Sequence, residues 1–162
     1  MRYVTLCFIG WLIAGTPTVP RAASAYALCP ATPVHTTNYH GKTFSLRGVP
    51  WIATSSHAIL GFLFFRSLHA RGDAALLHTG GKMPNGVRTK ILWVTIKPGS
   101  TGKLTIRGAN LTGPGTTHQA VPGSSGPGGN YPSIVRIPTA GCWRLTVRSG
   151  AVSGTVTMRV VG

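Results

Sequence analysis

Residues 141–161, GCWRLTVRSGAVSGTVTMRVV, decide the fold of this chain. Two runs of alternating apolar and polar residues flank Ser149-Gly150, which is the pattern of a β-hairpin. Successive side chains of a strand point to opposite faces, so Trp143, Leu145 and Val147 share one face of the first run. The second run alternates in the same way, with the face formed by Val152, Gly154, Val156, Met158 and Val160.

A two-residue loop at 149–150 predicts the register of this hairpin. The expected cross-strand pairs are Val147 with Val152, Leu145 with Gly154, and Trp143 with Val156. A slip of one residue would place apolar side chains opposite polar ones. The apolar face needs a second sheet to cover it. We therefore predict an all-β fold, an immunoglobulin-like β-sandwich of about seven strands preceded by a signal segment.

Composition supports one domain with many turns and a strong positive charge. The chain has 162 residues, with 22 Gly and 12 Pro. Sixteen Lys and Arg face one acid, Asp73, which gives a net charge of +15. Such a charge attracts anionic surfaces, among them lipid head groups, wall polymers and nucleic acid. No two basic residues are adjacent, so the sequence indicates no specific nucleic-acid patch.

Residues 1–25 have the layout of a secretory signal peptide. Arg2 precedes an apolar run over residues 3–15, and Ala23-Ser24-Ala25 offers a small-x-small cleavage site. The run is short for a membrane span, and an uncleaved anchor is the alternative that would bring the chain to a membrane. Cleavage removes Arg2 and Arg21, which leaves a charge of 15 − 2 = +13. We expect a secreted or extracytoplasmic protein of the cell envelope.

The domain plan that follows has three parts. We expect a signal peptide over 1–25, an extended N-terminal arm over 26–42, and a β-sandwich domain over 43–162. Prolines at 30 and 33 favour the extended arm.

Two cysteines remain after cleavage, and we predict a disulfide between Cys29 and Cys142. Strand parity puts Cys142 on the face opposite to Trp143, where a thiol has no place in the core but can tether the arm that begins at Cys29. The arm would then cross the sheet or cover an open edge. Two free thiols, or bridges between molecules, are the alternatives.

The middle of the chain is less clearly patterned. Residues 58–65 are continuously apolar and favour a buried strand, although Ser55-Ser56 could cap a helix running to residue 70. Residues 87–97 and 103–107 are expected to form a second hairpin, and 74–78 a short strand. Residues 113–130 are rich in Gly and Pro and predict a long surface loop.

No catalytic site or cofactor is predicted. A single acid excludes chemistry that needs paired carboxylates, and a Ser-His-Asp triad would have to use Asp73. No metal site is predicted either, because the spacings of the six histidines match no compact ligand motif. The histidines are His35, His40, His57, His69, His78 and His118. A copper- or zinc-binding extracytoplasmic protein that uses these surface histidines is the alternative function.

The outer face of the C-terminal hairpin offers the candidate binding site. Arg144, Arg148 and Arg159 alternate there with threonines. A fixed row of guanidinium groups suits bidentate capture of phosphate or carboxylate, although a merely solvated sheet face has the same pattern. We therefore expect a non-catalytic binding or structural module, with an anionic envelope polymer or lipid surface as its partner.

Several short motifs stand out along the chain: Cys29-Pro30, residues 38–41 (NYHG), 84–86 (PNG), 90–93 (KILW), 102–111 (GKLTIRGANL) and 138–143 (PTAGCW). With these motifs the chain resembles an uncharacterised family of secreted bacterial proteins. The resemblance covers about half of the chain after the signal segment, and residues 52–80 depart from the pattern. It implies an extracytoplasmic β-rich domain with an N-terminal Cys-Pro and a C-terminal Gly-Cys-Trp motif. It implies no activity.

Overall fold

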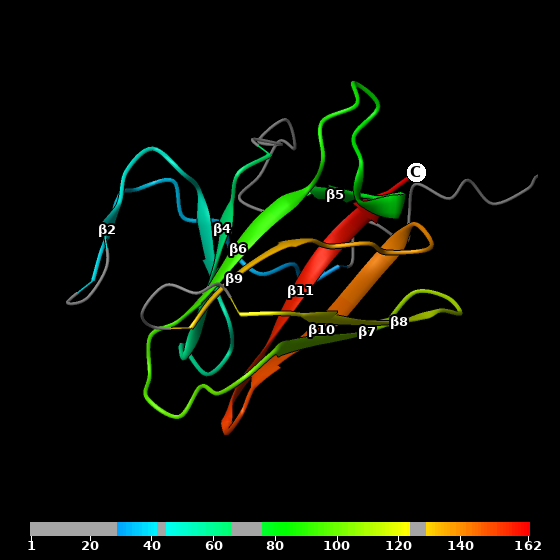
Figure 1. The fold of residues 1–162 in the computed structure, drawn as a ribbon. Coiled ribbons are helices and arrows are strands. Elements are labelled where there is room, and N and C mark those ends of the chain that lie inside the picture. The colour runs from blue at the N-terminus through cyan, green and yellow to red at the C-terminus, as the bar shows by residue number, and fades with distance from the viewer. Residues whose placement is uncertain (1–28, 42–44, 66–75, 124–128) are drawn as a thin grey trace, which may run out of the picture.

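The computed structural model describes residues 29–41, 45–65, 76–123 and 129–162, and in these residues the chain is all-β (Figure 1). The predicted signal segment 1–25 lies outside the described residues, as do residues 26–28 and 42–44 at the two ends of the predicted arm. The all-β prediction is confirmed.

Eleven strands and one short 3-10 turn make up the described residues. The strands are β1 Tyr39–His40, β2 Ser45–Leu46, β3 Trp51–Ala53, β4 Ile59–Leu63, β5 Leu76–His78, β6 Lys90–Thr95, β7 Leu104–Asn110, β8 Thr116–Val121, β9 Asn130–Ile134, β10 Gly141–Ser149 and β11 Val152–Val161. The 3-10 turn, Thr79–Gly81, follows β5. The expected number of about seven was too low because four of the strands have only two or three residues.

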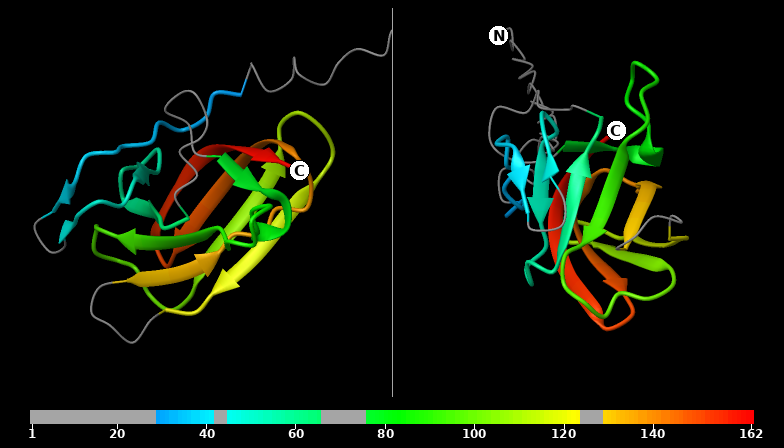
Figure 2. Two further views of the ribbon diagram at one scale, coloured as in Figure 1. Left: turned by 90° about the horizontal axis from the view of Figure 1, so that it is seen from above. Right: turned by 60° about the vertical axis from the view of Figure 1, so that its left-hand side comes forward.

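The strands form two large sheets and one small one. One large sheet has the order β5-β11-β10-β7-β8, the other has the order β3-β4-β6-β9, and β1 pairs with β2. All neighbours are antiparallel except β5 and β11, which are parallel. In Figure 2 the red and orange strands β10 and β11 belong to one layer, and the cyan and green strands β4 and β6 to the other.

The main core lies between the two large sheets. Ile91 and Trp93 from one sheet and Trp143 and Leu145 from the other belong to one cluster, and each is 0% exposed. The polar ends of both indoles are satisfied: Trp93 Nε1 donates to Ser133 Oγ at 3.1 Å and Trp143 Nε1 to the backbone oxygen of Thr139 at 2.9 Å. Buried indoles with satisfied N–H groups contribute large apolar area without a desolvation penalty.

The β10–β11 hairpin has the predicted faces but a different register. Trp143, Leu145 and Val147 are buried as expected, yet Ser149 pairs with Val152, and every expected pair is displaced by two residues. The loop is Gly150-Ala151, with Gly150 at φ 57°. Ser149 extends the strand because its hydroxyl lies inside, 2.7 Å from the Tyr131 hydroxyl.

A two-residue shift keeps the parity of every side chain. The alternation of apolar and polar residues therefore excludes a register shift of one residue but does not distinguish registers that differ by two.

The structure bears on four expectations for the middle of the chain, and the short strand expected over 74–78 is present as β5 in the described residues 76–78. The apolar run at 58–65 contains strand β4, so the strand prediction is confirmed over the helix. The expected hairpin of 87–97 with 103–107 is wrong: β6 pairs with β4 and β9, whereas β7 pairs with β10 and β8 in the other sheet. The loop expected over 113–130 is also wrong, since it contains β8 and the start of β9.

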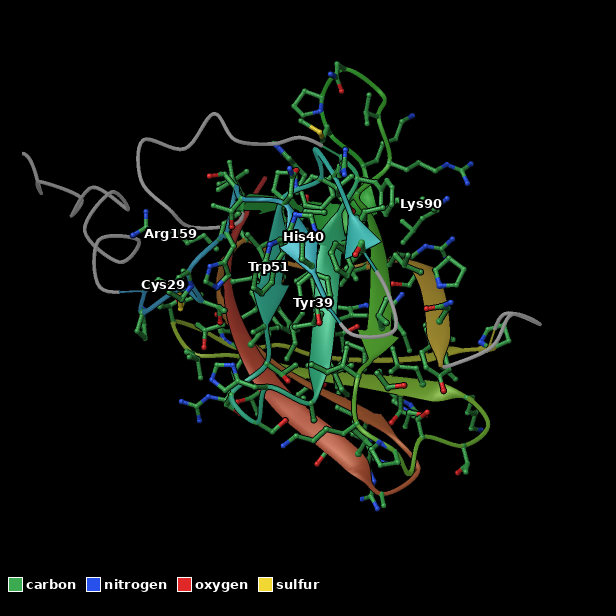
Figure 3. All side chains as sticks on the ribbon, turned by 90° about the vertical axis from the view of Figure 1, so that its left-hand side faces the viewer. Cys29, Tyr39, His40, Trp51, Lys90 and Arg159 are labelled. Carbon is green, nitrogen blue, oxygen red and sulfur yellow. A yellow bond between two sulfur atoms is a disulfide. The ribbon has the colours of Figure 1, made fainter. Side chains whose placement is uncertain are left out.

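Strand β6 is apolar on both faces because a second, smaller cluster covers its outer side. Leu60, Phe62 and Val94 are buried there beneath the β1–β2 hairpin. The Tyr39 ring meets Trp51 edge-on, with ring centroids 5.3 Å apart (Figure 3). It meets Phe62 in the same way at 5.6 Å. The arm thus adds a third layer to the outer face of the four-stranded sheet.

Candidate anion-binding face

The outer face of the five-stranded sheet carries the predicted arginine row. Trp143, Leu145 and Val147 point into the core, so Arg144 and Arg148, between and beyond them on β10, point outward, and both are exposed. The two arginines are four positions apart on the strand, which is about 13 Å. Arg148 Nε donates to the backbone oxygen of Gly150 at 2.9 Å, which leaves its terminal nitrogens free of that contact.

Arg159 shares this face but lies in a different environment. It stands opposite Cys142 on one side and Leu76 of β5 on the other, and it is half-buried. Its Nε is buried and has no hydrogen-bond partner in the described part of the chain. Figure 3 shows Arg159 near Cys29, at the corner of the sheet where the disulfide lies. The structure therefore separates Arg159 from the exposed pair.

Two further basic side chains belong to the face, and sequence reasoning missed them as site residues. Arg107 of β7 pairs with Thr146, the residue midway between Arg144 and Arg148, and His118 of β8 pairs with Arg107. Both side chains are exposed. The alternation of residues 103–107 already pointed Arg107 outward, but the neighbourhood of β7 and β10 depends on the sheet order.

No carboxylate from a described side chain offsets these charges. Asp73 is the single acid of the chain and lies outside the described residues. The guanidinium groups of Arg107, Arg144 and Arg148 therefore stay available to an external anion, to which they can each offer paired N–H donors.

The predicted disulfide is present. It joins Cys29 and Cys142, whose Cα atoms are 5.4 Å apart, within the range that a disulfide spans. Both residues are buried, with 6% and 1% exposure. The bridge holds the start of the arm on the outer side of the five-stranded sheet, where strand parity places Cys142.

The arm covers the free edge of β11. Thr32 N–H donates to the Thr157 oxygen at 2.7 Å, and Thr157 N–H donates back to Thr32 Oγ1 at 2.8 Å. Beyond the arm, Ser55 of the turn between β3 and β4 continues this cover: its N–H donates to the Thr155 oxygen at 2.8 Å, and its hydroxyl accepts from Thr155 N–H at 3.1 Å. Of the two possibilities for the arm, covering an edge is the one that the structure adopts.

An open groove of about 360 Å³ lies between the arm and β11. Its lining is rich in hydroxyl groups and has no Lys or Arg: Pro30, Ala31, Thr32, Pro33, Ala53, Thr54, Ser55, His57, Thr155 and Thr157. His57 has φ 51° and closes the turn that begins at Thr54, to whose oxygen its N–H donates at 2.8 Å. The groove is thus distinct from the basic face.

The described residues show neither a metal-binding cluster nor a membrane-spanning helix. Within residues 29–41, 45–65, 76–123 and 129–162, no three His, Cys, Asp or Glu residues gather in a way that could hold a metal ion. None of the helical segments described there is long and apolar enough to span a membrane.

Comparison with known proteins adds no relative: no family model, no curated protein and no solved structure matches this chain.

Proposed function

We propose that this protein is a secreted or envelope-associated, immunoglobulin-like β-sandwich that binds anionic envelope polymers or lipid surfaces without catalysis. The observation that carries the proposal is the exposed group Arg107, Arg144 and Arg148, whose guanidinium groups have no carboxylate partner among the described side chains. None of the three lines the groove beside β11. A flat basic face suits an extended polyanion or a charged surface better than a small molecule, which prefers a concave site.

The strand order supports the immunoglobulin-like part of the proposal. In a variable-type immunoglobulin domain, strands A, B and E lie in one sheet and G, F, C and C′ in the other. The orders β4-β6-β9 and β11-β10-β7-β8 correspond to these two series. On this assignment the chain crosses from one sheet to the other between β6 and β7, the two strands that were expected to form a hairpin.

Two features support an extracytoplasmic location. The signal-like pattern of residues 1–25 directs export, and a buried disulfide is stable where the surroundings are oxidising. Membership of the secreted family with the Cys-Pro and Gly-Cys-Trp motifs is part of the same proposal. The cysteines of the two motifs, Cys29 and Cys142, form the disulfide here, which gives a structural reason for the two motifs to occur together.

The test compares two triple variants of equal charge. Arg107, Arg144 and Arg148 are replaced by Ser in one, and the exposed residues Lys82, Arg88 and Lys90, which lie outside the five-stranded sheet, in the other. Partition onto vesicles with and without phosphatidylglycerol is measured by sedimentation. At about 1 kcal/mol per basic residue near an anionic surface, the face variant should lose roughly 100-fold in partition and the control much less.

Binding should also weaken steeply between roughly 50 and 200 mM salt. Equal losses in the two triple variants would mean diffuse attraction by net charge, and the proposed face would be wrong.

A further inference from the structure

The edges of the two sheets are treated differently, and one of them is open. A sheet edge presents unpaired N–H and C=O groups that can pair with another chain, so proteins usually cover or interrupt it. On β11 the main-chain N–H and C=O groups of Thr155 hydrogen-bond to Ser55, and those of Thr157 hydrogen-bond to Thr32. The Ser153 backbone oxygen accepts from Ser56 Oγ at 2.6 Å. Strand β5 then covers residues 159–161.

The edge of β3 is closed by the arm. His35 donates to the Trp51 oxygen at 2.8 Å and accepts from Trp51 N–H at 2.9 Å. The two rings stack with centroids 4.0 Å apart, which fixes this part of the arm against the strand.

The edge of β9 is closed by a proline and by side chains from β8. Thr95 N–H donates to the backbone oxygen of Gly129. In an antiparallel pair every second residue turns its main-chain groups toward the partner strand, so residues 131 and 133 face β6 and residue 132 faces the open side. Residue 132 is a proline and has no N–H to offer there. The Gln119 amide donates to the Ile134 oxygen at 3.3 Å and accepts from Arg136 N–H at 3.0 Å. These contacts occupy the groups that follow Pro132.

Strand β8 has no such protection. Asn110 N–H donates to the backbone oxygen of Gly115. Alternation from that hydrogen bond directs the main-chain N–H and C=O groups of Thr117, Gln119 and Val121 toward β7. The main-chain groups of Thr116, His118 and Ala120 therefore face outward, and none has a partner among the described residues. The strand, TTHQAV, contains no proline and no Lys, Arg, Asp or Glu.

We propose that β8 accepts an extended acidic polypeptide segment as an added strand. Main-chain pairing with Thr116, His118 and Ala120 would supply the binding, as in other cases of strand addition. The outward side chains of the added strand would lie beside His118, in the row that continues to Arg107. Acidic residues at alternate positions fit this row, because a carboxylate can accept a hydrogen bond from His118 and is attracted by the positive charge of Arg107 on the next strand.

Charge decides against a second copy of this chain as the occupant. Pairing β8 with β8 would place two basic sheet faces side by side, each on a chain of formal charge +15. Like charges brought together in this way oppose association. The inference uses Arg107 but does not depend on polymer binding by Arg144 and Arg148.

Two labelled peptides of identical composition provide the probe. In one, Glu alternates with Thr and Val over nine residues, and in the other all Glu residues stand at one end. Fluorescence anisotropy should show at least tenfold tighter binding of the alternating peptide, because only it keeps acids on one face of a strand. Equal affinity for the two peptides would overturn the proposal.

Matched variants of Ala120 locate the site. Ala120→Pro removes one N–H on the open side and spares the β7 ladder, so it should weaken the alternating peptide tenfold or more; Ala120→Ser keeps the N–H and should bind as the parent does. Unchanged binding by a folded Ala120→Pro protein would refute strand addition.

Hydrogen exchange of the parent protein covers the case in which that variant fails to fold. The alternating peptide should slow exchange of the Thr116, His118 and Ala120 amides, and unaltered rates would contradict the proposal. Self-association that Ala120→Pro abolishes would make a second copy the occupant instead. Arg144→Ser with Arg148→Ser should reduce vesicle binding and leave the preference between the peptides, which separates this inference from the proposed function.

Discussion

The two sides of the five-stranded sheet differ in how the main-chain N–H and C=O groups at the edge are covered. At one end, segments around Thr32 and Ser55, far from β11 in the chain, take its main-chain groups. At the other end, the outward main-chain groups of β8 have no hydrogen-bond partner among the described residues. The Gln119 side chain of β8 instead hydrogen-bonds to the main chain of Ile134 and Arg136, at and just after the end of β9. The β11 edge is thus covered by segments from elsewhere in the chain, one of which begins at a disulfide, whereas the β8 edge has no such cover among the described residues.

The disulfide ties the first part of the arm to the sheet whose edge it covers. Cys29 and Cys142 are 113 residues apart in sequence, and Thr32, which pairs with β11, follows three residues after the bridge. Free arm residues would lose conformational entropy on docking, about 1–2 kcal/mol for each residue ordered. Two hydrogen bonds at Thr32 offset little of that cost, since each contributes about 1 kcal/mol. The covalent link lowers it by keeping the arm near its site.

Breaking the tether should have the largest effect on this contrast. We expect Cys29→Ser with Cys142→Ser to lower the free energy of unfolding by about 2–5 kcal/mol, as for loss of a native disulfide that closes a long loop. Urea unfolding of the exported protein measures it. Amide exchange at Thr157 should rise toward the rate at Thr116, since its partner Thr32 belongs to the tethered arm, whereas exchange at Thr155, which is paired with Ser55, should change less. A stability within error of the parent would show that the arm docks unaided.

Crowding the covered edge should have an intermediate effect. Gly154 lets the turn at Thr54 and Ser56 approach β11, because a Cβ at that position would lie 2.6 Å from side-chain atoms of both residues. Gly154→Ala should cost about 1–3 kcal/mol through overpacking. Gly113→Ala is the matched control, since its nearest neighbour would be at 3.7 Å. Thermal unfolding compares the two, and equal shifts would mean that the close approach contributes nothing.

A single hydroxyl should show the smallest measurable difference between the edges. Ser55→Ala removes the acceptor of Thr155 N–H and should cost about 0.5–1.5 kcal/mol. Thr116→Ala, on the open edge of β8, should change stability by less than about 0.5 kcal/mol. Chemical denaturation of both variants gives the comparison. A larger loss at Thr116 would reverse the assignment of covered and open edges.

Sequence reasoning succeeded where a local pattern carries the information. The alternation of residues 141–161 placed Trp143 inside and Arg144 outside. The count of two cysteines after the signal segment predicted the disulfide between Cys29 and Cys142. It failed at β8, because Thr116–Val121 has few apolar residues and sits between Gly- and Pro-rich segments that resemble a loop. An edge strand of a sheet buries little of its own surface, so its hydrophobic signal is weak.

The candidate site shows the same division. Alternation could identify Arg144 and Arg148 as outward, but it could not set Arg159 apart as half-buried, nor bring Arg107 and His118 beside them. Those relations depend on the order of strands that are far apart in the chain.

By itself, then, the sequence determined the all-β class, the two faces of the C-terminal hairpin, the cysteine pairing and the large positive charge, because each follows from side-chain parity or from counting residues. The tertiary structure decided the hairpin register, the separation of β6 and β7 into different sheets, and which edges are covered. A shift of two residues keeps every side chain on its face, so alternation cannot detect it. Strand neighbours and edge contacts are set by long-range packing, about which a local pattern carries no information.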